Sequence, residues 1–162
     1  MYVPIHLDVR DMNIAVIGGG EIAWRKCQFF IVNKIPVTVV AKTFISDFKE
    51  PSSEKITLIE AAYKVDDIKD SHLVIAATND AVLNDEIGAY CKAEGKLVNV
   101  ASSALASNFI MPGIVQRSDL LLSVSTSGKN PSLAKSIKQE LQEQYGPEYE
   151  KIVQESIRVK GK

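Results

Sequence analysis

Short apolar runs rich in β-branched residues recur along the N-terminal part of the chain. They occupy residues 14–17, 37–41, 73–77 and 97–101. Each run is continuously apolar rather than alternating, which is typical of a parallel strand that is covered on both faces. Residues 56–61 look like a further strand. Together these runs predict a parallel sheet.

The first two runs are separated by a segment with helical periodicity. A helix is expected from about residue 21 to residue 33, because its apolar side chains then share one face. The residues on that face are Ala23, Cys27, Phe30 and Ile31.

Further helices separate the later runs. One is expected at residues 81–93, where Gly95 follows as a C-terminal cap, and residues 43–49 also look helical. Strands that alternate with helices imply right-handed crossovers and a doubly wound parallel α/β sheet. We place this domain at residues 1–112.

The pattern changes after Pro112. Residues 120–125 alternate between apolar and more polar side chains, which predicts one half-buried strand. In the loop that follows, Asn130 is suited to cap a helix and Pro131 to occupy its first turn. We interpret residues 113–146 as a small α+β dimerisation segment of a strand and a helix.

The last two predicted helices carry narrow apolar stripes. The first stripe consists of Leu133, Ile137 and Leu141. The final helix is expected from about Pro147, within residues 147–162, and its apolar face consists of Tyr149, Ile152, Val153, Ser156 and Ile157. No other element of the sequence covers these stripes easily, so we expect a homodimer that buries them.

Composition and charge narrow the function classes. The chain has 162 residues, 46% of them hydrophobic and 24% charged, and a net charge of -1. This charge offers no basic field for nucleic acid, and no apolar run reaches the roughly 18 residues of a membrane span. No signal-peptide pattern opens the sequence, so we expect a cytoplasmic protein that binds neither nucleic acid nor a membrane.

The cysteines and histidines do not form a metal-binding motif. Cys27 and Cys91 occur singly in helical segments and are expected to pack as small buried side chains. His6 and His72 have no Cys, Asp or Glu at ligand spacing, so we expect no protein-bound metal.

Three consecutive glycines join the first strand to the first helix. The segment matches the G-x-G-x-x-G/A fingerprint of dinucleotide-binding domains. Gly18 suits the positive-φ turn, Gly20 lets the backbone approach the phosphates, and Ala23 lets the helix pack closely on the strand. The first free N–H groups and the positive end of the helix dipole then face a pyrophosphate. A plain glycine-rich turn is the alternative.

A series of short segments occurs in order along the chain. They are PIHLD (4–8), GGGEIA (18–23), RK (25–26), VTVVA (37–41), AATND (76–80) with Asn84, VNV (98–100), NFIMP (108–112) and STSGKNP (125–131). Together they resemble the NAD-dependent precorrin-2 dehydrogenase module of siroheme synthesis. This module is the N-terminal part of siroheme synthase, and it also occurs as a free-standing bacterial enzyme. The resemblance covers roughly residues 2–145.

The resemblance implies an NAD-binding Rossmann domain, an intertwined dimerisation segment, and oxidation of precorrin-2 to sirohydrochlorin. It also implies that Glu21 and Ile22 lie against NAD, and that Lys42 and Thr43 touch its adenosine end. An acid such as Glu21 is also favoured in a first helical turn by the dipole alone.

The choice between NAD and NADP is left open by the residues. The fingerprint expects an Asp or Glu at the end of the second strand to bind the ribose 2′-hydroxyl. The sequence has Lys42 and Thr43 there instead. Thr43 could supply the hydroxyl contact, while Lys42 is equally suited to a 2′-phosphate or to solvation. Only the resemblance favours NAD.

Further polar residues end predicted strands at the ligand-binding edge of the sheet. Thr78 and Asn79 are expected near the nicotinamide ribose, whereas Asp80 is expected to cap the next helix. Asn99 and Ser102 are the candidates for catalysis in the tetrapyrrole pocket, with a hydroxyl-rich turn as the alternative.

One family residue is absent. Many bifunctional members have an aspartate two residues after V-N-V, implicated in both dehydrogenation and chelation, where this chain has Ser102. A positioned base contributes about 3–5 kcal/mol, whereas holding two reactants in register contributes about 7–11 kcal/mol. We therefore expect dehydrogenation to persist with little or no ferrochelatase activity, and a separate sirohydrochlorin ferrochelatase to act downstream.

Precorrin-2 carries many carboxylates, so its pocket is expected to supply cations. Arg117, Lys129 and Lys135 lie around the predicted dimerisation segment and are the candidates. Solvated surface charge is the alternative for each of them.

Two other functions are kept open. A non-enzymatic dimeric regulator that binds NAD or a tetrapyrrole fits the loss of the family aspartate. A Rossmann oxidoreductase for an unrelated small substrate fits the first domain, but it leaves the STSGKNP segment without a role.

Overall fold

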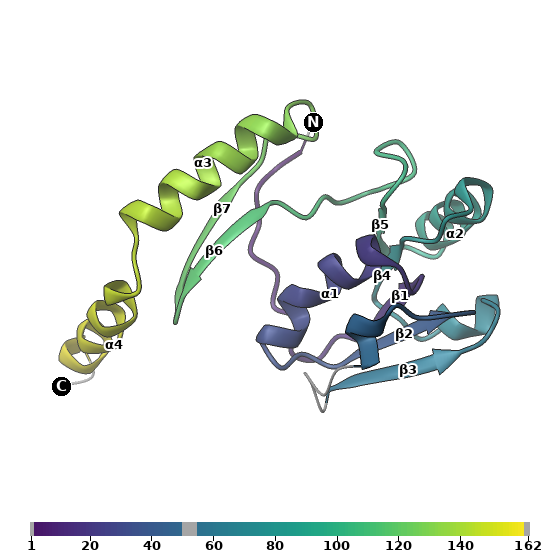
Figure 1. Cartoon of the computed structure of the whole chain (residues 1–162), viewed down its shortest axis with the longest axis horizontal. Coiled ribbons are helices and arrows are strands. Elements are labelled where there is room, and N and C mark those ends of the chain that lie inside the picture. The colour runs from purple at the N-terminus through teal and green to yellow at the C-terminus, as the bar shows by residue number, and fades with distance from the viewer. Residues whose placement is uncertain (1, 50–54, 161–162) are drawn as a thin grey trace. The chain divides into compact units, whose positions relative to one another are not determined.

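The computed structural model describes residues 2–49 and 55–160, and the side chains of residues 156–160 lie outside that description. The predicted face of the last helix includes Ser156 and Ile157, which fall among these side chains. Contacts divide the chain into two compact units, the first ending at Phe109 and the second beginning at Ile110. In Figure 1 the first unit runs from purple to teal, and the second from green to yellow.

The first unit is built on a five-stranded parallel sheet with the order β3-β2-β1-β4-β5. Its strands are β1 (Ile14–Ile17), β2 (Val37–Ala41), β3 (Ile56–Glu60), β4 (Leu73–Ala76) and β5 (Leu97–Val100). The predicted doubly wound α/β architecture is confirmed. Because the chain order reverses between β1 and β4, a ligand crevice is expected there, at the carboxyl ends of the strands.

Two helices of the first unit match the sequence pattern. Helix α1 (Glu21–Val32) buries the four predicted side chains. Helix α2 (Ala81–Ala93) begins after Asp80, whose Oδ1 accepts hydrogen bonds from the backbone N–H groups of Val82 and Leu83. Gly95 follows α2 with a φ of +68°, as a C-terminal glycine does.

The two helices cover opposite faces of the sheet. Ala15 and Ile17 of β1 belong to a buried cluster with Ile87 and Cys91 of α2. Alternate residues of β1 are equally buried but lie outside that cluster, and α1 contacts β1, β2 and β4 from their side. Cys27 and Cys91 are fully buried, as expected, and burial raises the pKa of their thiols to about 12 and about 11.

The segment after β2 is less helical than expected. A 3-10 helix, η1, covers only Ser46–Lys49, and Thr43 and Phe44 are not helical. The reason is a tertiary contact, because the N–H of Ile45 donates to the carbonyl oxygen of Gly19 at 2.9 Å and holds this loop against the glycines. A second 3-10 helix, η2 (Val65–Ile68), precedes β4 and was not predicted.

The second unit has a hairpin followed by two helices. These elements are β6 (Gly113–Arg117), β7 (Leu120–Val124), α3 (Pro131–Gln144) and α4 (Glu148–Lys160). Strands β6 and β7 are antiparallel, and Ser118 in the turn between them has a φ of +54°. Asn130 caps α3 as predicted, since its Oδ1 accepts from the N–H of Leu133 at 3.0 Å.

One expectation for this unit was wrong. The single predicted strand is a two-stranded hairpin, because Gly113–Arg117 pairs with β7 although its own pattern is weak. Helix α3 contacts both strands, but none of its residues is buried, so the chain does not bury its apolar stripe.

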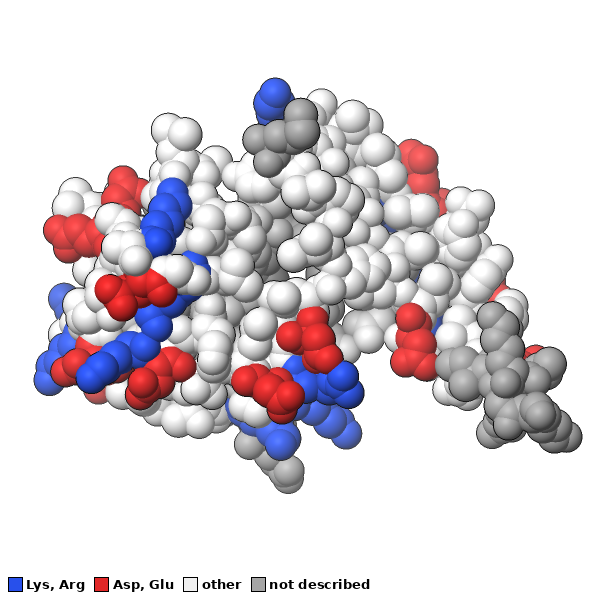
Figure 2. All heavy atoms as spheres, turned by 180° about the vertical axis from the view of Figure 1, so that it is seen from behind, with Lys and Arg blue, Asp and Glu red and all other residues white. Residues whose placement is uncertain are grey.

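Two surface features bear on possible partners, the apolar character of the helices and the distribution of charge. Among the described residues, no helix combines the length and apolar character that crossing a bilayer requires. On the face shown in Figure 2, acidic and basic side chains lie next to one another.

Candidate dinucleotide site

A cavity of about 660 Å³ opens at the carboxyl edge of the parallel sheet. Its walls come from the ends of β1, β2 and β4 and from the beginnings of α1 and α2. Eight of the nine predicted cofactor residues line it: Gly18, Gly20, Glu21, Ile22, Lys42, Thr43, Thr78 and Asn79. The ninth, Ala23, is fully buried in α1. The volume lies within the usual range for sites that bind small molecules and cofactors.

Each glycine of the loop has a different steric role. Gly18 has a φ of +128°, and a Cβ there would lie 2.3 Å from the carbonyl oxygen of Ala77. A Cβ on Gly19 would lie 2.1 Å from the carbonyl oxygen of Thr43. At Gly20 a Cβ would meet no protein atom within 4 Å, although Gly20 lines the cavity. Gly18 and Gly19 are therefore required by the fold, and Gly20 leaves room for a ligand.

The start of α1 is open toward this space. Gly20 is its N-cap and offers no side-chain hydrogen bond to the first turn. The first N–H groups of a helix have no partner within the helix, and its positive dipole end attracts anions. The fully buried methyl group of Ala23 keeps this helix close to the strands. The helix start thus fits a pyrophosphate.

The β4 end of the cavity is organised by Asn84, a residue that the sequence analysis did not assign to the site. Its Oδ1 accepts from the N–H and hydroxyl groups of Thr78, at 3.0 and 2.7 Å, and its Nδ2 donates to the carbonyl oxygen of Thr78. The Thr78 hydroxyl also accepts from the N–H of Asp80. Thr78 therefore shapes the turn, while Asn79 is exposed and makes no hydrogen bond within the described residues.

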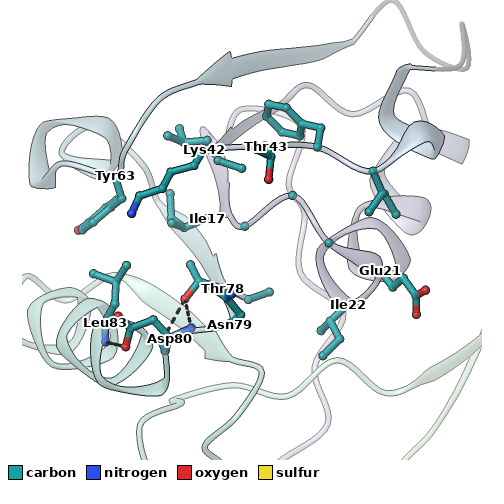
Figure 3. A pocket seen from close by; sticks show the side chains of 18 of the residues that line it. Ile17, Glu21, Ile22, Lys42, Thr43, Tyr63, Thr78, Asn79, Asp80 and Leu83 are labelled. Carbon is teal, nitrogen blue, oxygen red and sulfur yellow. Dashed lines mark hydrogen bonds between the residues drawn. The ribbon is translucent and has the colours of Figure 1, made fainter.

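An apolar wall completes the cavity. Tyr63 and Leu83 lie on it, as Figure 3 shows, and both pack on the buried cluster beneath. Burial raises the pKa of Tyr63 to about 12, so its hydroxyl stays protonated at neutral pH. The flat ring is a surface on which an adenine could pack. Tyr63 was missed because it follows a strand by three residues, outside any local motif.

The predicted catalytic residues lie away from this cavity. Asn99 is 6% exposed, and its Oδ1 accepts a hydrogen bond of 2.6 Å from Nζ of Lys26 on α1. Its Nδ2 donates to the carbonyl oxygen of Phe109. Ser102 is exposed, and its Oγ lies 3.4 Å from Nδ2 of Asn84. Within the described residues no hydrogen bond joins Asn99 to Ser102.

Lys26 is a third residue, after Asn84 and Tyr63, that the sequence did not assign to a site. It is half-buried, and burial together with the nearby Arg25 lowers its pKa. No carboxylate in the described part of the chain forms an ion pair with it. Its position in the matched RK segment was the available signal, but only the fold shows that it reaches β5.

The three predicted substrate cations do not cluster within one chain. Nη2 of Arg117 donates to the carbonyl oxygen of Gln142 near the C-terminal end of α3, and its buried Nε has no hydrogen-bond partner in the described structure. Lys129 precedes α3, and Lys135 lies in its first half, where both are exposed. A helix of 14 residues is about 21 Å long, so Arg117 and Lys129 mark opposite ends of it.

Fold and cavity together define the class of protein, a Rossmann-type dinucleotide-binding protein. The sequence matches the family described as "Putative NAD(P)-binding" over residues 5–113. The solved structure of "SirC, precorrin-2 dehydrogenase" matches with a TM-score of 0.76 and 31% identity, covering 95% of this chain and 76% of that one. The chain belongs to the NAD(P)-binding family of precorrin-2 dehydrogenases, which confirms the predicted resemblance and class of cofactor.

Longer relatives give the same assignment. Siroheme synthase of Ruthia magnifica subsp. Calyptogena magnifica is 34% identical over 154 residues, which are 94% of this chain and 33% of that protein. Siroheme synthase of Nitrosococcus oceani is 37% identical over 142 residues, 87% of this chain and 30% of that protein. The chain thus spans about a third of the length of these curated relatives.

Proposed function

We propose that this chain oxidises precorrin-2 to sirohydrochlorin with NAD as the electron acceptor. The open start of α1 at Gly20, facing a cavity of about 660 Å³, carries the proposal. Family membership together with SirC supports the choice of substrate.

The cavity lining divides into three binding regions for a dinucleotide. Gly18, Gly20 and the N–H groups of the first turn, which begins with Glu21 and Ile22, would hold the pyrophosphate. Lys42 and Thr43 would hold the adenosine end, and Thr78 and Asn79 the nicotinamide ribose. When bound, the nicotinamide supplies the carbon that accepts a hydride. The protein residues bind, orient and desolvate.

Asn99 would position the ammonium group of Lys26, which donates a hydrogen bond to its Oδ1. Both ends of its amide are already hydrogen-bonded, so Asn99 is a positioning residue in this proposal rather than a group that touches substrate. Ser102, exposed at the same edge of the sheet, remains the candidate for passing a substrate proton to water. Lys26→Gln should change the pH dependence of turnover, whereas Lys26→Arg should restore it if the cation is the essential feature.

The second unit is assigned to dimerisation and substrate binding. In this proposal residues 1–112 hold the dinucleotide, residues 113–146 form the dimer contact, and residues 147–162 add the last helix. Arg117, Lys129 and Lys135 would bind substrate carboxylates. Because they lie at both ends of α3, a single substrate carboxylate cannot contact all three within one chain.

The missing family aspartate limits the proposed activity. No carboxylate occurs between Asn99 and Arg117, and metal insertion requires pyrrole protons to leave. We therefore propose little or no ferrochelatase activity, with a separate sirohydrochlorin ferrochelatase downstream. The cytoplasmic location stays a prediction.

An anaerobic assay with precorrin-2 and NAD⁺ tests the activity. Sirohydrochlorin and NADH should form in equal amounts. Sirohydrochlorin without NADH would contradict hydride transfer, tight binding without turnover would favour the regulatory alternative, and rapid siroheme formation with added iron would contradict the lack of chelatase.

Gly20→Val is the matched variant for the dinucleotide site. Gly20 has a φ of -94° and a ψ of -175°, which any residue adopts, and its Cβ would meet no protein atom within 4 Å. The variant should keep the unfolding temperature of the parent protein and lose dinucleotide binding. Unchanged binding would show that the pyrophosphate does not lie at this helix start.

A further inference from the structure

Lys26 carries a partly buried positive charge in the first unit. It lies in the middle of α1 and is half-buried. Its Nζ donates a hydrogen bond of 2.6 Å to Oδ1 of Asn99 on β5. Removing a charge from water is costly unless an opposite charge or several hydrogen bonds compensate it. The Lys26 ammonium group therefore requires compensation from its surroundings.

The described part of the chain gives this ammonium group a neutral partner and no anion. Of its three N–H donors, one is used by the hydrogen bond to Asn99. Among the described residues no carboxylate oxygen lies within the 4.0 Å of an ion pair from Nζ. Burial and the nearby Arg25, a charge of the same sign, lower the pKa of Lys26. Two N–H donors and the charge are thus available to an anion from outside the chain.

Asn99 holds the ammonium group without neutralising it. The Asn99 Nδ2 donates to the carbonyl oxygen of Phe109 at 3.0 Å, which fixes the amide with its Oδ1 toward Lys26. Asn99 is 6% exposed, so its amide has little room to turn. An aspartate at this position would pair with Lys26 and cancel its charge. The amide instead positions a cation that keeps its charge.

The Lys26–Asn99 pair lies one strand away from the strand that ends at the dinucleotide cavity. Strand β5 pairs with β4, and Asn99 is opposite Ile75 in the ladder. Neighbouring strands are about 4.8 Å apart. Beyond β4 the chain continues into Thr78 and Asn79, which line the cavity where the nicotinamide ribose is proposed to bind (Figure 3). A molecule that reacts with the nicotinamide lies beside it, and the end of β5 is then within its reach.

We propose that the ammonium group of Lys26, held by Asn99, binds a carboxylate of the tetrapyrrole substrate and so orients the substrate beside the nicotinamide. A carboxylate would offset the burial of this charge, which a neutral amide does only in part. This inference rests on the proposed function. It adds a substrate contact in the first unit to the three cations proposed for the second.

Anaerobic titration of the full chain with sirohydrochlorin, followed by the absorbance of the macrocycle, tests the contact without turnover. Lys26→Gln should weaken sirohydrochlorin binding about tenfold or more, because a charge-assisted hydrogen bond is lost. Lys26→Arg should restore most of the affinity, since it keeps the charge. Both variants should bind NADH as the parent chain does. In the dehydrogenase assay, Lys26→Gln should raise the KM for precorrin-2 by a larger factor than it lowers kcat.

Lys34→Gln is the matched control. It removes the same charge at an exposed lysine just beyond the C-terminal end of α1, and it should leave the affinity for sirohydrochlorin unchanged. An equal loss in this variant would show that only the net charge of the protein matters, which would overturn the inference.

The methyl ester of sirohydrochlorin and free acetate distinguish the possible sources of the carboxylate. The ester carries no charge, so the parent and Lys26→Gln should bind it equally well. An equal loss of affinity for the ester and the free acid would show that no substrate carboxylate meets Lys26. If acetate stabilises the parent but not Lys26→Gln against heat, while both bind sirohydrochlorin equally, the site takes a small free anion and the inference is wrong.

The outcomes separate this inference from the proposed function. If the parent chain binds sirohydrochlorin and NADH, and Lys26→Gln binds both equally well, the carboxylate contact is wrong while the proposed function stands. If Lys26→Gln weakens NADH and sirohydrochlorin by the same factor, Lys26 supports the fold of the site rather than a substrate carboxylate, which also overturns the inference. If the parent chain binds neither molecule, the proposed function itself fails.

Discussion

Strand β1 and helix α1 of the first unit differ from α3 and β7 of the second in how well the chain covers their apolar side chains. Every residue of β1 is at most 3% exposed, and α1 buries four side chains. In the second unit α3 and β7 bury none, and Leu133 remains 48% exposed. The sheet of the first unit therefore has a buried core, whereas α3 of the second unit presents apolar side chains that a second copy of the chain is proposed to cover.

We expect the largest loss of stability from Gly18→Val in the first unit. The added Cβ would lie 2.3 Å from the Ala77 carbonyl oxygen, in a backbone conformation with a φ of +128°. Overpacking and strain together should lower the free energy of unfolding by about 3 kcal/mol or more. Thermal unfolding measures this change, and the Gly20→Val variant is the control. Equal unfolding temperatures for Gly18→Val and the parent would refute the close approach of β1 to β4.

Leu133→Asp tests the second unit. Leu133 is too exposed to contribute much to the stability of a single chain. In a two-fold dimer interface each of the two chains would bury its own Leu133, so the substitution would remove two buried side chains. The substitution should weaken dimerisation about 100-fold or more, since each buried Leu contributes about 1.5–3 kcal/mol. Sedimentation across a range of concentrations measures the change.

Alkylation of the cysteines measures whether the first unit stays folded in the Leu133→Asp variant. Cys27 and Cys91 should stay protected in Leu133→Asp, because their burial does not depend on the second unit's helices. Gln139→Asp, on the exposed side of α3, should leave the dimer intact. A monomeric parent chain, or cysteines exposed by Leu133→Asp, would contradict the contrast between the units.

The pH dependence of stability should belong to the first unit. The folded-state pKa of Cys27 is raised from 9.0 to about 12 by burial, so its contribution is fully present below pH 9 and is lost as the pH rises toward 12. At pH 10 the loss is about 1.4 kcal/mol. Cys27→Ala should flatten the fall in unfolding free energy between pH 9 and pH 11 in denaturant titrations. Leu133→Asp, compared as a monomer, should keep the slope of the parent.

The smallest effects are expected from the two helix caps. Asp80→Ala in α2 and Asn130→Ala in α3 each remove a side chain that accepts backbone N–H groups. Each should cost about 1 kcal/mol. Asp80→Ala should lower the stability of the first unit at any concentration. Asn130→Ala should instead make unfolding more dependent on concentration, and an identical response of both variants would argue against a separately stabilised second unit.

Local patterns predicted most of the first unit. Continuous apolar runs located β1, β2, β4 and β5, and the apolar face located α1, because each signal arises within a few neighbouring residues. Strand β6 was missed since Gly113–Arg117 becomes a strand only through pairing with β7. The length of η1 was overestimated because a contact with Gly19, distant in sequence, ends the helical character.

The candidate site also contains residues that local sequence patterns identified and residues that only the fold identified. The glycine motif and the polar strand ends identified eight cavity residues, because parallel strands bring their carboxyl ends to one edge. Asn84, Tyr63 and Lys26 gained their roles from contacts with residues that no local pattern connects to them. Asn99 was correctly placed on its strand, but its burial and its hydrogen bond to Lys26 depend on how α1 lies over the sheet.

The amino-acid sequence by itself determined the alternation of strands and helices, the helix caps at Asp80 and Asn130, and a phosphate-binding loop with glycines in the required order. Propensity, periodicity and capping act over short stretches of chain, so they can be identified without the fold. Tertiary structure alone decided which polar groups are free to meet a ligand. Burial and hydrogen bonding remove Asn99 from that set, and the cavity walls bring Tyr63 into it.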